Sequence, residues 1–90
     1  MSASDEELGL HFPCDFPIKV IGKSERALHD SVEKILNIHV DTEHQTSIKE
    51  RHSKGARFIS ITVTIQAQSR KQLDELYIAF NKHDDIMMVL

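Results

Sequence analysis

The chain has 90 residues, of which 40% are hydrophobic and 28% charged, and its formal charge is −3. This length suits one domain with a modest core, and the composition argues against disorder throughout. Three acids, Asp5, Glu6 and Glu7, lie in a head without Lys or Arg, which leaves 11 acidic against 11 basic residues in the rest. Because a neutral body lacks the basic excess of a broad phosphate-binding surface, nucleic acid is not an expected partner.

Cysteine usage and hydropathy indicate where the protein works. Cys14 is the only cysteine, so no disulfide can form within the chain, which favours a reducing compartment. No apolar run approaches the roughly 20 residues needed to span a bilayer, and the acidic N-terminus does not resemble a signal peptide. The sequence therefore predicts a cytoplasmic protein without a membrane partner.

The first part of the chain predicts a head, a strap and a short strand. Residues 1–11 read as a flexible acidic head, and residues 12–90 as a single domain. Two prolines keep residues 12–17 extended, which predicts a strap across the domain. Residues 18–21 are rich in β-branched side chains and predict a strand that ends at Gly22.

A helix and an edge strand are expected next. Ser24 is the expected N-cap of a helix that runs to about His39, with apolar residues at helical spacing. Residues 46–52 alternate weakly around one aliphatic side chain, which predicts a strand. Its charges are those of a guarded sheet edge, supplied by Lys49, Glu50 and Arg51.

Residues 56–67 carry the strongest strand pattern in the chain. A turn around Gly55 precedes them, so they form a hairpin with the edge strand. Aliphatic side chains alternate with polar ones, which predicts one buried and one accessible face. The buried face holds Ile59, Ile61, Val63 and Ile65, and the other holds Phe58, Ser60, Thr62, Thr64 and Gln66.

The last part predicts a helix and a final strand. Ser69 and Gln72 form a capping box before an apolar stripe of helical spacing, and residues 86–90 are apolar throughout. The order β-α-β-β-α-β predicts an α+β, ferredoxin-like sandwich, in which a four-stranded antiparallel sheet carries two helices on one face. We expect the first and third strands to be central and parallel, with the second and fourth at the edges.

Several segments together resemble the YbeD family of small bacterial proteins of unknown function. The resemblance covers about residues 12–90 and rests on the order of its motifs, which are Phe12-Pro13-x-x-Phe16-x-x-Lys19-Val20-x-Gly22, Ser53-Lys54-Gly55, residues 60–64, and Asp85-Ile86-x-Met88-Val89-Leu90. It implies a ferredoxin-like fold similar to the amino-acid-binding ACT regulatory domains, and a role near lipoate metabolism. It carries over no catalytic residues.

The expected topology suggests a site for a small anion. If the first and third strands end side by side, the N-termini of both helices meet at one end of the sheet. Backbone N–H groups and helix dipoles there favour a carboxylate or phosphate. The candidate residues are Lys23, Ser24, Arg26, Ser69, Arg70 and Lys71. The alternative is a solvated surface in which the two serines only cap their helices.

The last strand suggests a surface for a protein partner. It is apolar on both faces and lacks the charges that guard the other edge, so it can accept a strand from a second copy or from another protein. The interaction surface is predicted from Phe58, Ile86, Met88 and Leu90. Alternatively, the helices cover one face of this last strand and Phe12 and Phe16 cover its other face, so that no partner is needed. Four basic residues near the hairpin suit an acidic partner, namely Lys49, Arg51, Lys54 and Arg57.

Other chemistries find less support. Residues 54–61 echo an RNA-recognition motif, but Ala56 and Lys19 stand where base-stacking aromatics are required. The six histidines show no paired ligand spacing, so neither a metal nor another cofactor is expected. No acylphosphatase-like loop or nucleophile triad is present, so the chain is not expected to be an enzyme. We expect a small regulatory or adaptor domain that acts by protein–protein interaction, or alternatively an ACT-like sensor of an anionic metabolite, which the family resemblance links to lipoate.

Overall fold

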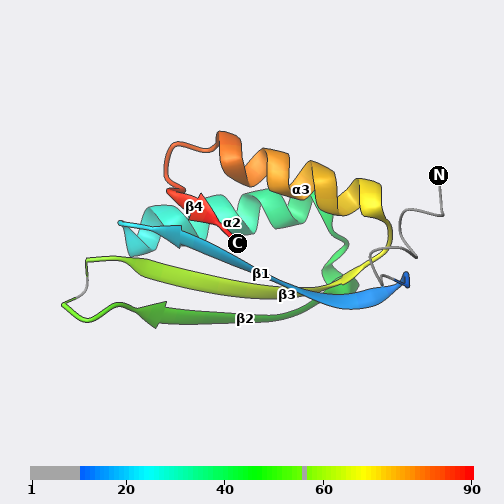
Figure 1. Ribbon diagram of the computed structural model, residues 1–90, viewed down its shortest axis with the longest axis horizontal. Helices are drawn as coiled ribbons and strands as arrows, with labels where there is room; N and C mark the ends of the chain where they lie inside the picture. The colour runs from blue at the N-terminus through cyan, green and yellow to red at the C-terminus, as the bar shows by residue number, and fades with distance from the viewer. Residues whose placement is uncertain (1–10, 56) are drawn as a thin grey trace.

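The computed structural model describes residues 11–55 and 57–90, so nearly all of the predicted acidic head lies outside the described residues. The sheet has the order β2-β3-β1-β4, and each neighbouring pair is antiparallel. Both helices cover one face of this sheet (Figure 1), which confirms the predicted ferredoxin-like sandwich. The elements are β1 (Cys14–Gly22), α2 (Glu25–His39), the 3-10 turn η1 (Thr42–His44), β2 (Gln45–His52), β3 (Ile59–Ala67), α3 (Arg70–Lys82) and β4 (Met88–Val89).

The two central strands are antiparallel, so the prediction that they run parallel is wrong. Gly22 at the end of β1 pairs with Ile59 at the start of β3, while Cys14 pairs with Ala67. The connections explain this direction. The α2 crossover returns the chain to the end of the sheet where β1 begins, so β2 runs parallel to β1. The hairpin then reverses the chain, and β3 therefore runs antiparallel to both strands.

Strand β1 is longer than predicted, because the expected strap belongs to it from Cys14 onward. Pro17 fits in this strand without loss of a ladder hydrogen bond. Lys19 N–H donates to the Leu90 carbonyl at 3.1 Å, and Leu90 N–H donates to the Lys19 carbonyl at 2.8 Å. Pro17 lies two residues earlier and faces the same side, where β4 no longer runs alongside β1.

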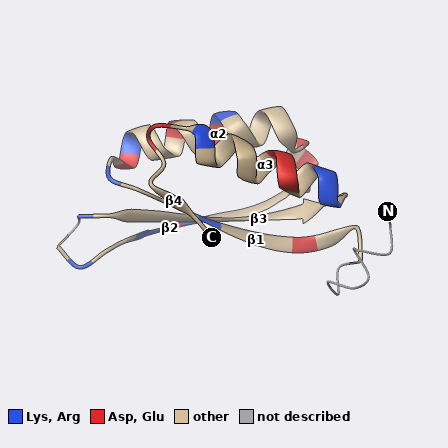
Figure 2. Ribbon diagram, turned by 45° about the horizontal axis from the view of Figure 1, so that its top comes forward, with Lys and Arg blue, Asp and Glu red and all other residues tan. Residues whose placement is uncertain are grey.

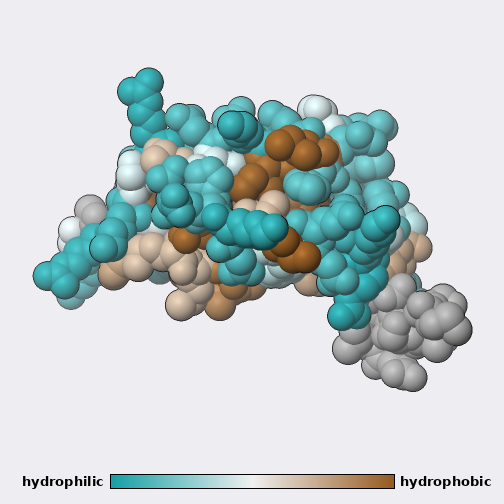
Figure 3. Space-filling view, turned by 90° about the horizontal axis from the view of Figure 1, so that it is seen from above, coloured by the Kyte–Doolittle hydropathy of each residue, from teal (hydrophilic) through white to brown (hydrophobic). Residues whose placement is uncertain are grey.

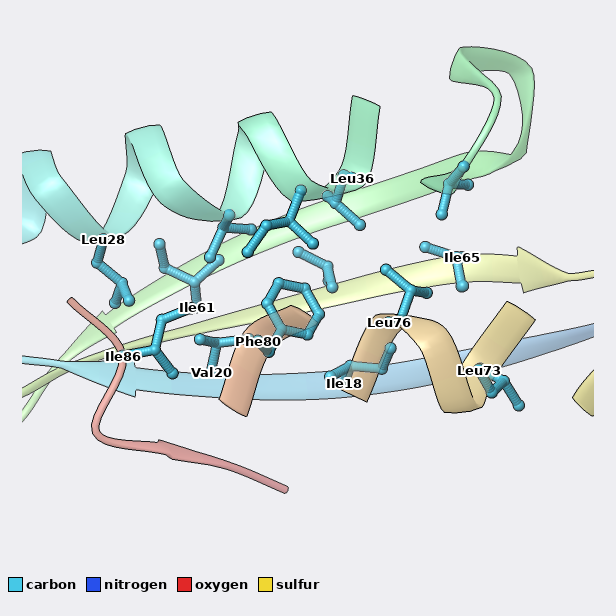
Figure 4. Packing of buried hydrophobic residues seen from close by; sticks show 14 of the residues in the cluster. Ile18, Val20, Leu28, Leu36, Ile61, Ile65, Leu73, Leu76, Phe80 and Ile86 are labelled. Atoms are coloured by element: carbon cyan, nitrogen blue, oxygen red, sulfur yellow. The ribbon is translucent and has the colours of Figure 1, made fainter. Parts of the chain in front are cut away.

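The core lies between the sheet and the helix layer. On β3 the predicted face is buried, with Ile61, Val63 and Ile65 all 0% exposed. Phe80 of α3 inserts against Ile18 and Val20 of β1 (Figure 4) and is also fully buried. Phe12 and Phe16 pack against this same core. They do not cover the opposite face of the sheet, so the alternative in which they take the place of a partner there is wrong.

Both helices begin at the predicted caps. The Ser24 hydroxyl accepts a hydrogen bond from Ala27 N–H at 3.4 Å, and the Ser69 hydroxyl accepts one from Gln72 N–H at 3.1 Å. The outer surface of the helix layer is mostly hydrophilic with small hydrophobic patches (Figure 3), and Ile38 and Ile78 are the helical aliphatics that remain largely exposed. Among the described residues, no helix combines the length and hydrophobicity needed to cross a membrane.

Candidate functional site

The sheet face opposite the helices carries three basic side chains around two hydroxyls. Strand register places Thr62 of β3 between Lys19 of β1 and Lys49 of β2, and the next row places Ser60 beside Arg51. Side chains that share a face alternate along a strand, so all five point away from the helices. Because strands lie about 4.8 Å apart, the backbones of Lys19 and Lys49 are separated by roughly 10 Å. Both ammonium groups can therefore reach one anion above Thr62.

These cations have no anionic partner in residues 11–55 and 57–90. Every ion pair found there involves other basic groups, namely His29, His52, Arg70 and His83. Asp15 shares the open face but lies near the far end of β1, four residues from Lys19. Lys and Arg also mark β2 and the turn that leads into β3 (Figure 2). This part of the face is therefore a cationic surface whose charge is not compensated locally.

An apolar rim borders the cationic surface. Ile21 of β1 pairs with Ser60 on one side and with Met88 on the other. Met88, Leu90 and Phe58 are 52%, 60% and 39% exposed, so each offers apolar surface to a partner. The resulting face combines cations, hydroxyls and exposed apolar groups.

Two adjoining hollows lie on this face, with volumes of about 230 and 350 Å³. Both are lined by Lys19, Arg51 and Ser60. The first extends toward Ile21 and Phe58, whereas the second extends toward Lys49 and Thr62. No helix covers them, because both helices occupy the other side of the sheet (Figure 1). We call this the open-face site, and define it by Lys19, Ile21, Lys49, Arg51, Phe58, Ser60 and Thr62.

The predicted anion site at the two helix N-termini is not assembled. Lys23, Ser24 and Arg26 lie where β1 leads into α2, whereas Ser69, Arg70 and Lys71 lie where β3 leads into α3. Since β1 and β3 are antiparallel, these ends are separated by about a nine-residue strand, or roughly 30 Å. The starts of the two helices lie at opposite ends of the molecule (Figure 1). Both serines act as helix caps, as the alternative explanation proposed.

The predicted interaction surface is divided by the structure. Phe58, Met88 and Leu90 are exposed, but Ile86 is only 8% exposed and belongs to the core. Ile86 lies beside Val20 and Ile61 (Figure 4), so its inclusion in the surface is wrong. Strand β4 is an edge strand as predicted, but it comprises only Met88 and Val89.

The sequence analysis assigned no binding role to Lys19, and used it only as evidence against RNA binding, because it occupies a position where an aromatic side chain is required. Its alternation with Ile18 and Val20 placed it on the accessible face of β1, and Lys49 alternates in the same way on β2. Their convergence required the strand register, which puts both beside Thr62. The alternation pattern in each strand indicated that its lysine is exposed, but one sequence does not predict the register that places the two lysines side by side.

A second polar cluster lies on the other side of β2, where it faces α2. Glu50 contacts His29, and it accepts a hydrogen bond from His52 at 2.8 Å. The pKa of Glu50 is lowered, chiefly by a hydrogen bond with the Glu25 side chain and further by those with His29 and His52. Glu50 is therefore a carboxylate at neutral pH, held between two histidines.

Comparisons with known proteins agree on the family and the fold. The family described as "Protein of unknown function (DUF493)" matches residues 7–90 of this chain. A UPF0250 protein of Nitrosomonas europaea is 41% identical over 85 residues, which are 94% of this chain and 98% of that protein. A UPF0250 protein of Chromobacterium violaceum is 34% identical over the full length of both chains.

Two solved structures share the fold. Protein HP0495 from H. pylori superposes with a TM-score of 0.71 at 18% identity, and the match covers 90% of this chain and 85% of that one. The uncharacterized protein TM1266 from Thermotoga maritima gives a TM-score of 0.62 at 9% identity, with 84% and 92% covered. At these identities the likeness establishes the arrangement of strands and helices alone.

Proposed function

This chain belongs to the DUF493 family of bacterial proteins of unknown function, and we propose that it is a binding module whose open-face site receives an acidic segment of another protein. The family is the one whose members are called UPF0250 proteins, so the resemblance to the YbeD family is confirmed. A module of this kind acts as a regulatory or adaptor domain, through association rather than catalysis.

The observation that supports this proposal is the uncovered cationic face itself. Lys19, Lys49 and Arg51 converge beside two hydroxyls, without an acidic neighbour in salt-bridge range among the described residues. Carboxylates of a partner would supply the missing counter-charges, and charge complementarity increases both association rate and specificity. The apolar rim adds Phe58 and Met88, which could bury an aliphatic or aromatic side chain of the same segment.

The shape of the site favours an extended segment over an enclosed small molecule. Small-molecule sites typically enclose most of the ligand surface, whereas these two hollows lie side by side on one sheet face. A second copy of this chain fits less well. A twofold dimer through this face would set Lys19, Lys49 and Arg51 of one copy near the same cations of the other, which is unfavourable.

Addition of a strand at β4 is a weaker way to bind. Strand addition requires a run of free backbone donors and acceptors, but β4 comprises only Met88 and Val89, and the neighbouring Leu90 backbone groups already pair with Lys19 of β1. Very short edge strands discourage such pairing. The proposal therefore places recognition in the side chains of the sheet face.

Photo-crosslinking can test the proposal in a lysate of the source bacterium. A crosslinking residue at Thr62 samples the open face, and one at Lys34 samples the exposed side of α2. We expect a discrete protein to crosslink from Thr62 alone, through a segment rich in Asp and Glu when the adduct is mapped. The double variant Lys49→Glu/Arg51→Glu should abolish this adduct. Arg70→Glu/Lys71→Glu makes the same charge change outside the site and should not.

Two results would contradict the proposal. One is an equal yield of the adduct from Thr62 and Lys34, and the other is an adduct that survives Lys49→Glu/Arg51→Glu. Sedimentation of the purified chain at several concentrations accompanies the experiment, because a dimer that persists in Lys49→Glu/Arg51→Glu would indicate self-association through another surface.

A small anionic metabolite is the second candidate, favoured by the row in which Thr62 lies between Lys19 and Lys49. This version retains the predicted sensor but moves it from the helix N-termini to the open face. Titration of the ¹⁵N-labelled chain with lipoate, phosphate and amino acids distinguishes the two candidates. Saturable shifts at Thr62 that are lost in Lys49→Glu would favour a sensor, whereas silent amides would leave the protein segment.

A further inference from the structure

Two pairs of potential metal ligands converge between α2 and β2. Glu25 and His29 are four residues apart on α2 and therefore share one face of that helix. Glu50 and His52 are two residues apart on β2 and share one face of that strand. The spacing within each pair is the one that its element requires for two side chains to reach the same point.

The strand register shows that Glu50 and His52 of β2 lie on the side of the sheet that faces α2. Glu50 pairs with Ile61 and His52 with Ile59, and both of these isoleucines face the helix layer. Arg51 lies between them in sequence and belongs to the open face, so its charge points away from the cluster. Edge strand β2 and the first half of α2 thus present their polar side chains to each other.

The side-chain atoms are already close to one another. His52 Nε2 lies 2.8 Å from one Glu50 carboxylate oxygen and 3.7 Å from a Glu25 oxygen. His29 Nε2 contacts the other Glu50 oxygen. The ligand atoms of Glu25, Glu50 and His52 all lie within 4.8 Å of one another. Four atoms around a tetrahedral zinc ion lie about 3.4 Å apart, given bonds of about 2.0–2.2 Å.

We propose that Glu25, His29, Glu50 and His52 bind one divalent transition-metal ion of the zinc type. Glu25, Glu50 and His52 already lie together and supply three ligands of a tetrahedral site. His29, which contacts Glu50, would turn toward the ion and supply the fourth. The side chains are partly open to solvent, from 21% exposed for Glu50 to 55% for Glu25, so an ion can enter without unfolding. The bound ion would join the edge strand to the helix layer.

The ligand set also determines which ions compete. Imidazole favours zinc, cobalt, nickel and copper, whereas magnesium and calcium prefer sites made only of oxygen ligands. The site should therefore bind Zn²⁺ and Co²⁺ in the presence of a large excess of Mg²⁺. This separates a built transition-metal site from a group of acids that attracts any divalent ion.

Calorimetric titration of the full chain with ZnCl₂ tests the proposal, with protein free of any histidine tag. We expect one ion per chain, and absorption of the Co²⁺ form should report tetrahedral coordination. Glu50→Gln and His52→Ala should each weaken Zn²⁺ binding by at least roughly tenfold, since even loss of an indirect partner of a metal ligand typically costs about 10- to 100-fold. At a Zn²⁺ concentration near the native Kd, Zn²⁺ should raise the melting temperature of the native chain more than that of either variant.

The matched controls are Glu43→Gln and His44→Ala, which remove the same chemical groups from the η1 turn outside the cluster. Both should bind Zn²⁺ as the native chain does. The proposal is overturned if the native chain shows no saturable Zn²⁺ binding, or if Glu50→Gln and His52→Ala bind as tightly as the controls. Circular dichroism of each variant verifies that it folds, and His29→Ala provides an independent ligand variant if either of the first two does not.

Discussion

At the residue scale, Gly22 is a position where no other side chain fits. A Cβ atom there would lie 2.7 Å from the Asp85 carbonyl oxygen and 2.9 Å from Leu28 Cδ1. Leu28 is fully buried and Asp85 presents backbone, so neither can move away at low cost. We expect Gly22→Ala to lower the free energy of unfolding by about 1–3 kcal/mol, as measured by denaturant titration.

Gly55 supplies the control for this prediction. Its φ is +83°, but a Cβ atom there would meet nothing within 4 Å. Asn tolerates this left-handed conformation, so Gly55→Asn should change the free energy of unfolding by no more than about 0.5 kcal/mol. Equal losses in Gly22→Ala and Gly55→Asn would show that crowding at Gly22 is not the cause.

Tyr77 is the only tyrosine, and the chain has no tryptophan, so its phenol can be titrated by ultraviolet absorption without interference. Burial raises the pKa of Tyr77 above its ordinary value. The midpoint should therefore lie above about 10 in the folded chain and return to about 10 in urea. Because the folded state holds this proton more tightly, its stabilising contribution is complete below about pH 10 and is lost as the pH rises through the folded pKa. A folded midpoint at or below the urea value would contradict this.

At the element scale, Gln72 links the start of α3 to the end of α2. Its side-chain oxygen accepts a hydrogen bond from Gln68 N–H at 2.8 Å, and its amide donates to the His39 carbonyl at 3.0 Å. The second bond satisfies a carbonyl at a helix C-terminus, where no intrahelical partner remains. Gln72→Ala should therefore cost about 1–2 kcal/mol of unfolding free energy in denaturant titrations.

Two variants separate the contributions of Gln72. Ser69→Ala removes only the hydroxyl that accepts from Gln72 N–H, and should cost about 1 kcal/mol. Gln72→Glu keeps the acceptor for Gln68 but loses the donor to His39, so it should fall between the native chain and Gln72→Ala. If Gln72→Glu has the same free energy of unfolding as the native chain, the hydrogen bond from Gln72 to the His39 carbonyl contributes nothing to stability.

The C-terminal segment has two faces with different roles. Ile86 is 8% exposed within the core, whereas Met88 is 52% exposed on the open face. Ile86→Ala should lower the free energy of unfolding by about 2–4 kcal/mol, but Met88→Ala by less than about 0.5 kcal/mol. Thermal or denaturant melts can measure both. Similar losses for the two variants would mean that Ile86 is not buried more deeply than Met88 in the folded chain.

At the scale of the whole molecule, local patterns predicted what they directly encode. The alternation of Ile59, Ile61, Val63 and Ile65 gave the buried face of β3, and Ser24 and Ser69 gave both helix starts. Each of these features depends on neighbours within a few residues along the chain. The order of elements and the edge position of β2 followed from connection rules in the same way.

Features that depend on pairing between distant segments were not predicted. The direction of β3 against β1 separated Ser24 from Ser69, and the strand register brought Lys19 beside Lys49. The histidines show no paired spacing among themselves, and the contact of His29 on α2 with Glu50 on β2 depends on how the helix packs against the edge strand. Apolar content alone could not tell that Ile86 enters the core.

The same pairing predicts how stability is distributed over the sheet. The nine residues of β3 pair with β1 along their whole length and lie next to β2 on the other side, whereas β4 has two paired residues at an edge. Amides of Ile61 and Val63 should therefore exchange with solvent only through global unfolding, and those of β4 through local opening. Hydrogen exchange followed by NMR should show protection in β1 and β3 well above that in β4. If the Leu90 amide, which donates to the Lys19 carbonyl at 2.8 Å, exchanges as slowly as that of Val63, the C-terminal segment unfolds together with the core. The apolar rim at Met88 and Leu90 would then be a fixed part of the open face rather than a mobile border.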